Sequence, residues 1–233
     1  MEMKKGAFLS TVRVAFPYTV PVMAGYLVLS VAYGILMQSK GCSPVWALLV
    51  SLLAYSGSMQ YAAVPYFAAP FDPLGAFVFS LTINARYFFC SMGMLDRFAD
   101  AGKSRPLLFY MLSDESFAIA ATTPPPPEMS SGAFYMAVFV QNYLYWGIGT
   151  LAGGLLGSLL PFAIQGLDFT LTAMYVAMLT DMLRQRSTRR CALVGAGCSL
   201  AALLVFGSDR MVIPALGLIF LIFIPTRRKL SWV

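Results

Sequence analysis

The sequence predicts an all-α, polytopic membrane helix bundle of about 6–8 transmembrane segments. Three observations support this fold class. Hydrophobic residues make up 59% of the 233-residue chain, charged residues make up only 11%, and the apolar residues gather in runs long enough to cross a bilayer. A soluble domain is about 25% charged and could not bury this much apolar surface. The net charge of +6 does not indicate nucleic-acid binding, because the basic residues lie in short clusters beside the apolar runs, where they set membrane topology.

The apolar runs can be assigned in order, and together they predict one transmembrane domain over residues 1–233. They cover residues 16–37, 45–69, 73–95, 106–123, 132–157, 161–183, 191–207 and 211–224. The first run has no charge and follows Lys4, Lys5 and Arg13; it is too long for the apolar part of a signal peptide, so it predicts a first transmembrane helix. Proline opens the third and fourth runs, and the prolines at 124–127 predict a rigid connector that cannot continue a helix.

The second run is broken at its centre by "YSGSMQ", residues 55–60. Gly57 permits a backbone turn, so we expect the helix to be interrupted there. An interrupted helix exposes free N–H groups and the positive end of a dipole, which suit a carboxylate. Ser56, Gly57, Ser58 and Gln60 are therefore candidate substrate-binding residues. The alternative is a kinked, dry helix whose serines bond their own backbone.

The basic clusters leave two topologies open. They lie at the N-terminus, at 96–105, at 184–190 and at the C-terminus. If all eight runs cross the membrane, 96–105 lies on the opposite side from the others. If 45–69 and 161–183 are re-entrant hairpins, every cluster and both termini are cytoplasmic. The halves 14–123 and 132–225 would then be inverted repeats, a plan that recurs in secondary transporters.

Asn84 and Arg86 lie inside the third apolar run, and an arginine at the centre of a membrane helix costs roughly 2.5–3.5 kcal/mol. Arg86 lies nine residues before the end of its run, and Glu115 lies nine residues after the start of the next, so both sit about 13 Å from the shared loop. This equal depth predicts an ion pair of Arg86 with Asp114 or Glu115 and favours Glu115. The other acid, Asp114, is then expected to carry a proton, and Asn84 to contact substrate. The alternative is a pair that only holds the bundle together.

Other residues exclude several kinds of chemistry. The chain has no histidine and no phosphate-binding loop motif, so we predict no enzyme activity, no catalytic residue, no metal site and no cofactor. The four cysteines form no C-x-x-C pair. Gly149, Gly153 and Gly157 predict a close helix contact, within the chain or with another subunit. Gln141 and Asn142 are expected to join helices, and Asp168 to cap one.

The segments "YSGSMQYAA", "LTINARYFF", "LSDESFAIA" and "GLDF" closely resemble the AzlC family of branched-chain amino acid permeases. The resemblance implies a transporter subunit of the bacterial inner membrane that exports valine, leucine, isoleucine and methionine, driven by protons. It also implies a small hydrophobic partner subunit of the AzlD type. The family's functional positions are carried here by Gln60, Asn84, Arg86, Asp114 and Glu115. Two further hypotheses stay open: an amino acid importer, and a non-transporting scaffold or receptor subunit.

Overall fold

The computed structural model describes residues 5–67, 70, 72–159, 169–184, 186–207, 211, 214–215, 217–219 and 221–222. The chain divides into two compact units, Met1–Leu171 and Thr172–Val233, which are described separately. The residues that could form the sites discussed below all lie in the first unit.

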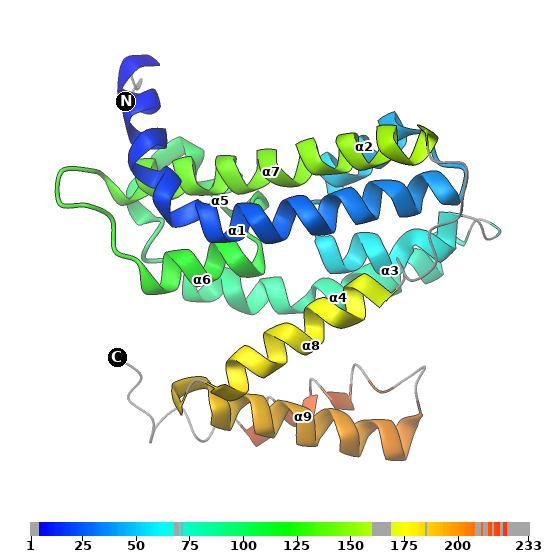
Figure 1. Cartoon of the computed structure of the whole chain (residues 1–233). Helices are drawn as coiled ribbons and strands as arrows, with labels where there is room; N and C mark the ends of the chain where they lie inside the picture. The colour runs from blue at the N-terminus through cyan, green and yellow to red at the C-terminus, as the bar shows by residue number, and fades with distance from the viewer. Residues whose placement is uncertain are drawn as a thin grey trace. The chain divides into compact units, whose positions relative to one another are not determined.

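Every regular element in the described part of the chain is a helix (Figure 1), as the composition predicts. The helices are α1 (Lys5–Ser39), α2 (Pro44–Ala54), α3 (Gly57–Phe67), α4 (Pro73–Gly93), the short 3₁₀ helix η1 (Ala99–Ser104), α5 (Arg105–Tyr110), α6 (Asp114–Thr122), α7 (Ser131–Leu159), α8 (Phe169–Arg184) and α9 (Arg186–Phe206). Among the described residues, Ser10–Ser39, Pro73–Gly93 and Arg189–Phe206 are helices long and apolar enough to cross a membrane. The polytopic all-α class is therefore confirmed.

The long helices α1 and α7 pack side by side and run in the same direction (Figure 1). Val12 near the start of α1 contacts Gln141, whereas Ser30 meets Gly149 and residues further along α1 meet Gly153 and Gly157. A methyl group at any of these three glycines would collide with α1. The predicted small-residue face therefore makes a contact within the chain, because only glycine lets the two backbones approach this closely.

The second apolar run forms a hairpin of α2 and α3, which we call hairpin 1. Pro44 at its start lies against Gly154, whereas the far end of α2 lies against Tyr143, whose hydroxyl donates to the Leu52 carbonyl at 2.8 Å. The chain then turns, and α3 runs back, so that Tyr61 bonds the Leu29 carbonyl of α1 at 2.6 Å. Each arm has 11 residues, or about 16 Å, roughly half the hydrocarbon thickness. Hairpin 1 thus begins and ends at the same end of the bundle, as the re-entrant plan predicts.

The break in hairpin 1 is made by Tyr55 and not by Gly57. Tyr55 has φ of 37° and ψ of 48°, the left-handed conformation that ends a helix, and Gly57 is already the first residue of α3. Glycine is needed at position 57 for space: a Cβ there would lie 2.9 Å from the Trp146 ring. The expected interruption of the helix is confirmed. Gly57, which was predicted to make the turn, instead leaves room for the Trp146 ring.

The expectation of one helix over residues 106–123 is wrong. The chain forms α5, breaks at Met111–Ser113, and returns as α6; we call this hairpin 2. It starts beside η1, where Ala101 packs on Gly132 at the start of α7. It returns to the same end, where the Tyr135 hydroxyl donates to the Thr123 carbonyl at 3.1 Å. Two short arms replace one spanning helix because Ser113 caps α6 through its side chain and so starts a new helix inside the run.

The order of a hairpin followed by a long helix therefore occurs twice. Hairpin 1 precedes α4, which runs from the end of the bundle where α1 finishes toward η1. Hairpin 2 precedes α7, which runs the opposite way (Figure 1). These repeats, 44–93 and 105–159, differ from the halves 14–123 and 132–225 considered above, which stay a prediction. The tips of the two hairpins meet: the Tyr110 hydroxyl of hairpin 2 bonds the Leu52 carbonyl of hairpin 1.

The second unit holds most of α8 and all of α9. The C-terminal end of α9 is followed by Gly207, whose φ of 74° is the left-handed conformation typical of a helix end. Cys198 and Ala202 are buried one turn apart on α9. Part of the second predicted hairpin, 161–183, lies outside the described residues, and so does Asp168. The described residues 169–183 of that segment belong to the continuous helix α8.

Candidate functional site

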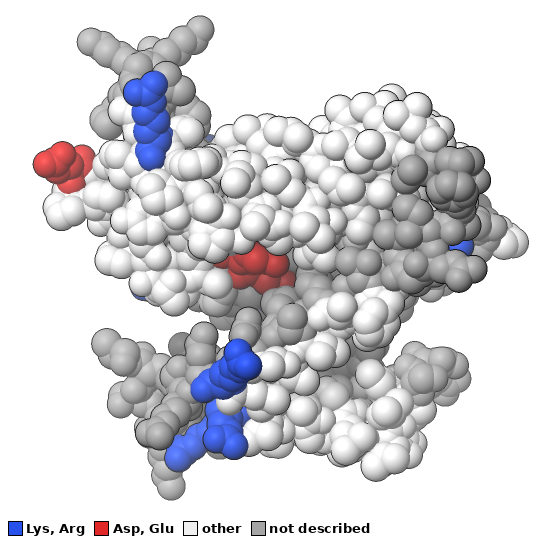
Figure 2. Space-filling view, viewed as in Figure 1, with Lys and Arg blue, Asp and Glu red and all other residues white. Residues whose placement is uncertain are grey.

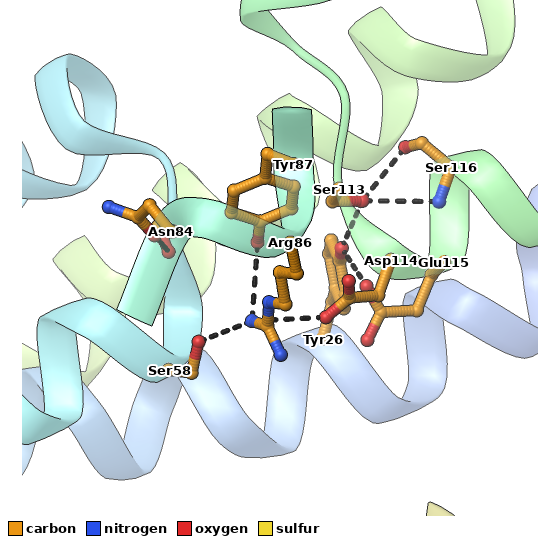
Figure 3. A network of polar contacts seen from close by, with 10 residues as sticks. Tyr26, Ser58, Asn84, Arg86, Tyr87, Ser113, Asp114, Glu115 and Ser116 are labelled. Atoms are coloured by element: carbon orange, nitrogen blue, oxygen red, sulfur yellow. Dashed lines mark hydrogen bonds and ion pairs between the residues drawn. The ribbon is translucent and has the colours of Figure 1, made fainter. Parts of the chain in front are cut away.

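An ion pair lies where the hairpin tips meet (Figure 3). Arg86 Nη2 of α4 is 3.1 Å from Asp114 Oδ2 of hairpin 2, and it also donates to the hydroxyl of Ser58 in hairpin 1. The guanidinium lies over the Tyr87 ring, 5.1 Å from its centroid. Arg86 thus joins α4 to both hairpins, and its charge is offset by the carboxylate.

The structure corrects the choice of partner. Equal depth favoured Glu115, but Asp114 forms the pair. The depth was counted along one continuous helix from Pro106, and the break at 111–113 makes that count invalid. The two acids instead occupy the first turn of α6, where the positive end of the helix dipole stabilises negative charge.

Glu115 is held separately by α1 (Figure 3). The Tyr26 hydroxyl lies 2.6 Å from Glu115 Oε2 and 2.7 Å from Ser113 Oγ. Ser113 Oγ also accepts the Ser116 backbone N–H at 3.1 Å, and Asn142 Nδ2 of α7 donates to Ser116 Oγ at 3.0 Å. A chain of hydrogen bonds therefore runs from α1 through the start of α6 to α7. Among the described residues Glu115 makes no salt bridge, so the two adjacent acids have different partners.

The two hairpins contact the following long helices in a similar way. In the first repeat, Ser56 Oγ just before α3 donates to Asn84 Oδ1 of α4 at 2.7 Å. In the second, Asn142 of α7 donates to Ser116 in the first turn of α6. An asparagine of each long helix thus bonds a serine at the preceding hairpin tip, and these bonds fix the tips on the bundle.

Gln60 lies in a different polar cluster, between hairpin 1 and α7. Its Oε1 accepts from Ser51 Oγ and from Trp146 Nε1, each at 3.0 Å, and Ser51 also bonds Thr150 Oγ1 at 3.0 Å. Only 1% of Gln60 is exposed, and its Nε2 has no hydrogen-bond partner among the described residues. These contacts of Gln60 hold hairpin 1 against α7 and do not join it to Arg86.

The predicted residues thus fall into two groups. Arg86 contacts both Asp114 and Ser58 directly, with Glu115 one residue from the pair. The others lie around them: Ser56 and Asn84 bond each other, Gly57 packs against Trp146, and Gln60 lies in the second cluster. Gln141 and Asn142 join α7 to α1 and α6, as expected of polar residues within an apolar helix.

Sequence reasoning missed Tyr26, Ser113 and Ser116. Ser113 carried a usable signal, since a serine directly before an acidic pair is a typical helix N-cap. Tyr26 gave none, because it is one tyrosine in a long apolar run and meets Glu115 only through the fold. In the described part of the chain, no group of three or more His, Cys, Asp or Glu side chains could hold a metal ion.

The acidic residues reach the surface of the first unit. In Figure 2, acidic atoms appear over the start of α6 and against α1. The exposed fractions of the paired side chains are 31% for Arg86 and 26% for Asp114. The ion pair is therefore partly exposed on the first unit rather than sealed in its core.

Apolar helices, two opposed hairpins of short helices and ionisable side chains near their tips define a class: a helical membrane protein with an internal polar site. Residues 21–160 match the family described as AzlC protein. The chain is 36% identical over 213 residues to the branched-chain amino acid transport protein AzlC of Bacillus subtilis, covering 91% of this chain and 84% of that protein.

Two further relatives are also described as membrane proteins. One, described as an uncharacterized membrane protein of Haemophilus influenzae, is 34% identical, covering 94% of this chain and 90% of the relative. The other, the inner membrane protein YgaZ of Escherichia coli, is 26% identical, covering 76% of each. No solved structure matches. The chain belongs to the AzlC family, and these similarities support a role in membrane transport.

Proposed function

We propose that the protein exports the branched-chain amino acids valine, leucine and isoleucine across the bacterial inner membrane in exchange for protons. Methionine is proposed as a further substrate. We further propose that the protein does so with a small membrane subunit of the AzlD type and without enzymatic activity. The name of the Bacillus subtilis relative supports the substrate class. The observation that carries the proposal is the meeting of a guanidinium and two carboxylates at the tips of two hairpins that come from opposite ends of the bundle.

The charge distribution supports a cytoplasmic N-terminus. Lys5, Arg13, Arg97, Lys103 and Arg105 all belong to the end of the bundle where α1 begins and η1 lies. By the positive-inside rule that end faces the cytoplasm. Hairpin 2 then enters the membrane from the cytoplasmic side, and hairpin 1 enters it from the other side. Rocking of two inverted repeats around a fixed central site would expose that site to each side in turn.

The two acids support a division of roles. Asp114 is occupied by Arg86, whereas Glu115 has a hydroxyl partner, Tyr26, and no cationic partner among the described residues. A carboxylate without a cation is the one that can take up and release a proton during the cycle. We therefore assign proton transfer to Glu115. This reverses the roles that equal depth favoured, since Asp114 now holds the ion pair.

Vesicles test this proposal. Right-side-out vesicles that contain the protein and its small partner subunit are loaded with labelled valine, and efflux is measured with and without an inward proton gradient. We expect the gradient to accelerate efflux. The Glu115→Gln variant should lose this acceleration and keep exchange of internal for external valine, because exchange needs no proton transfer.

The controls separate the alternatives. Asp100→Asn, an exposed acid in η1, should behave as the unmodified protein does. Valine uptake driven by the same gradient would identify an importer. If neither flux exceeds that of empty vesicles, the protein is not a transporter of these amino acids.

A further inference from the structure

We propose that Asp114 occupies, in the empty protein, the place on Arg86 that the substrate carboxylate takes, and that it then pairs with the substrate ammonium. The internal carboxylate is thus a surrogate ligand, and it makes the site select zwitterions over anions. This inference rests on the proposed transport of amino acids. It names the residues that recognise the two charges of the substrate.

The first argument is geometric. Asp114 Oδ2 lies 3.1 Å from Arg86 Nη2, the distance at which a substrate carboxylate would bind the same guanidinium. About a quarter of Asp114 and a third of Arg86 are exposed, so a solute can reach both groups. Asp114 is the first residue of α6, and the proposal requires only that its side chain adopts another rotamer.

The second argument is the charge balance. A zwitterion inserted between Arg86 and Asp114 leaves the net charge of the site unchanged, and each of its charges gains an opposite partner. A carboxylate without an ammonium adds one negative charge and leaves Asp114 without a cation. In a partly desolvated site an uncompensated charge is costly, so such an anion is rejected. Glu115 has a different partner, since its Oε2 accepts a hydrogen bond from the Tyr26 hydroxyl.

Equilibrium binding of labelled valine to the purified full-length protein together with its small partner subunit tests the inference, with unlabelled 2-oxoisovalerate as competitor. This keto acid has the side chain and carboxylate of valine but no ammonium. The unmodified protein should bind valine and discriminate against the keto acid. In Asp114→Asn the ratio of valine to keto-acid affinity should fall by about tenfold to 100-fold, the scale of an unpaired, partly buried charge. Asp114→Glu should restore the preference, and Asp100→Asn should leave it unchanged.

Several results would overturn the inference. One is an unchanged affinity ratio in Asp114→Asn. Another is an equal loss of preference in Glu115→Gln, which would show that any lost negative charge admits anions. The unmodified protein provides a test that does not depend on variants folding: binding of 2-oxoisovalerate or N-acetylvaline as tight as that of valine also rejects it. A protein that binds no branched-chain amino acid at all would instead contradict the proposed function.

Discussion

Arg86 receives its partners from two segments that are distant in sequence, Ser58 in hairpin 1 and Asp114 in hairpin 2. A guanidinium inside an apolar helix is tolerated because one contact supplies an opposite charge and the other an acceptor. Tyr26 donates a hydrogen bond to Glu115, so that Glu115 and the ion pair have different partners. The two neighbouring acids consequently respond differently to substitution.

Replacing Arg86 by alanine should destabilise the protein by about 2 kcal/mol, between the values typical of exposed and of buried pairs. The reason is that Asp114 loses its cation while it stays partly buried, and its partial exposure limits the cost. Thermal unfolding in detergent measures the loss. The double variant Arg86→Ala, Asp114→Ala should recover most of the stability and still fail to transport. Full transport by the double variant would show that the pair is only structural.

Tyr26→Phe removes the hydroxyl that bonds Glu115 and keeps the ring, which packs edge-on against Trp146 at a centroid distance of 5.3 Å. We expect a loss of about 1–2 kcal/mol in the free energy of unfolding, because a hydrogen bond to a partly buried carboxyl is lost. Unfolding of the single variants and of Tyr26→Phe with Glu115→Gln forms a double-mutant cycle. Strict additivity in that cycle would contradict the contact.

At the scale of elements, the contact of α1 with α7 depends on glycines from both helices. Gly34 faces the Thr150 carbonyl and the Gly154 backbone, so an added methyl group has no free space and no flexible neighbour that could move aside. The same helix contains Gly25, where an added methyl group would meet nothing within 4 Å. The pair offers a matched comparison within one helix.

Gly34→Ala should therefore destabilise the protein by roughly 1–3 kcal/mol, the usual cost of overpacking. Gly25→Ala should be neutral or stabilising by up to about 1 kcal/mol, because alanine has the higher helix propensity. Thermal unfolding and the yield of monodisperse protein measure both effects. Equal effects of the two substitutions would mean that α1 and α7 do not approach as closely as described.

Across the whole protein, the two hairpins determine which loops lie on the same side of the membrane. If hairpin 2 returns to its starting end, Glu128 in the proline-containing connector lies on the same side as η1. If residues 106–123 crossed as one helix, the connector would lie on the opposite side. Both Glu128 and Lys40, which follows α1, are exposed and suit labelling.

We expect Glu128→Cys, in a background without other cysteines, to react with an impermeant thiol reagent only from the cytoplasmic side. Lys40→Cys should react only from the outside, because α1 crosses between the two ends. Intact cells and inverted vesicles distinguish the sides. Labelling of Glu128→Cys from the outside would contradict the second hairpin and support the continuous helix.

Three features could be predicted from the sequence alone: the membrane class, the interruption of the helix between residues 55 and 60, and the pairing of Arg86 with one of two adjacent acids. Each depends on local facts: the length and polarity of a run, or the high cost of an isolated charge in it. The family resemblance likewise depends on short segments that can be compared without a fold.

The choice of acid that pairs with Arg86, the place of the second hairpin and the role of Tyr26 could be read only from the folded chain. The physical reason is that these features depend on contacts between distant segments. A single serine cap at Ser113 turned an apolar run into two short helices, and that turn changed the depth of both acids. Tyr26 and Glu115 are 89 residues apart in sequence, and no local pattern at either position indicates that they meet. Gly57 shows the same limit: its small size serves the Trp146 ring, a neighbour that only the packing of α7 brings to it.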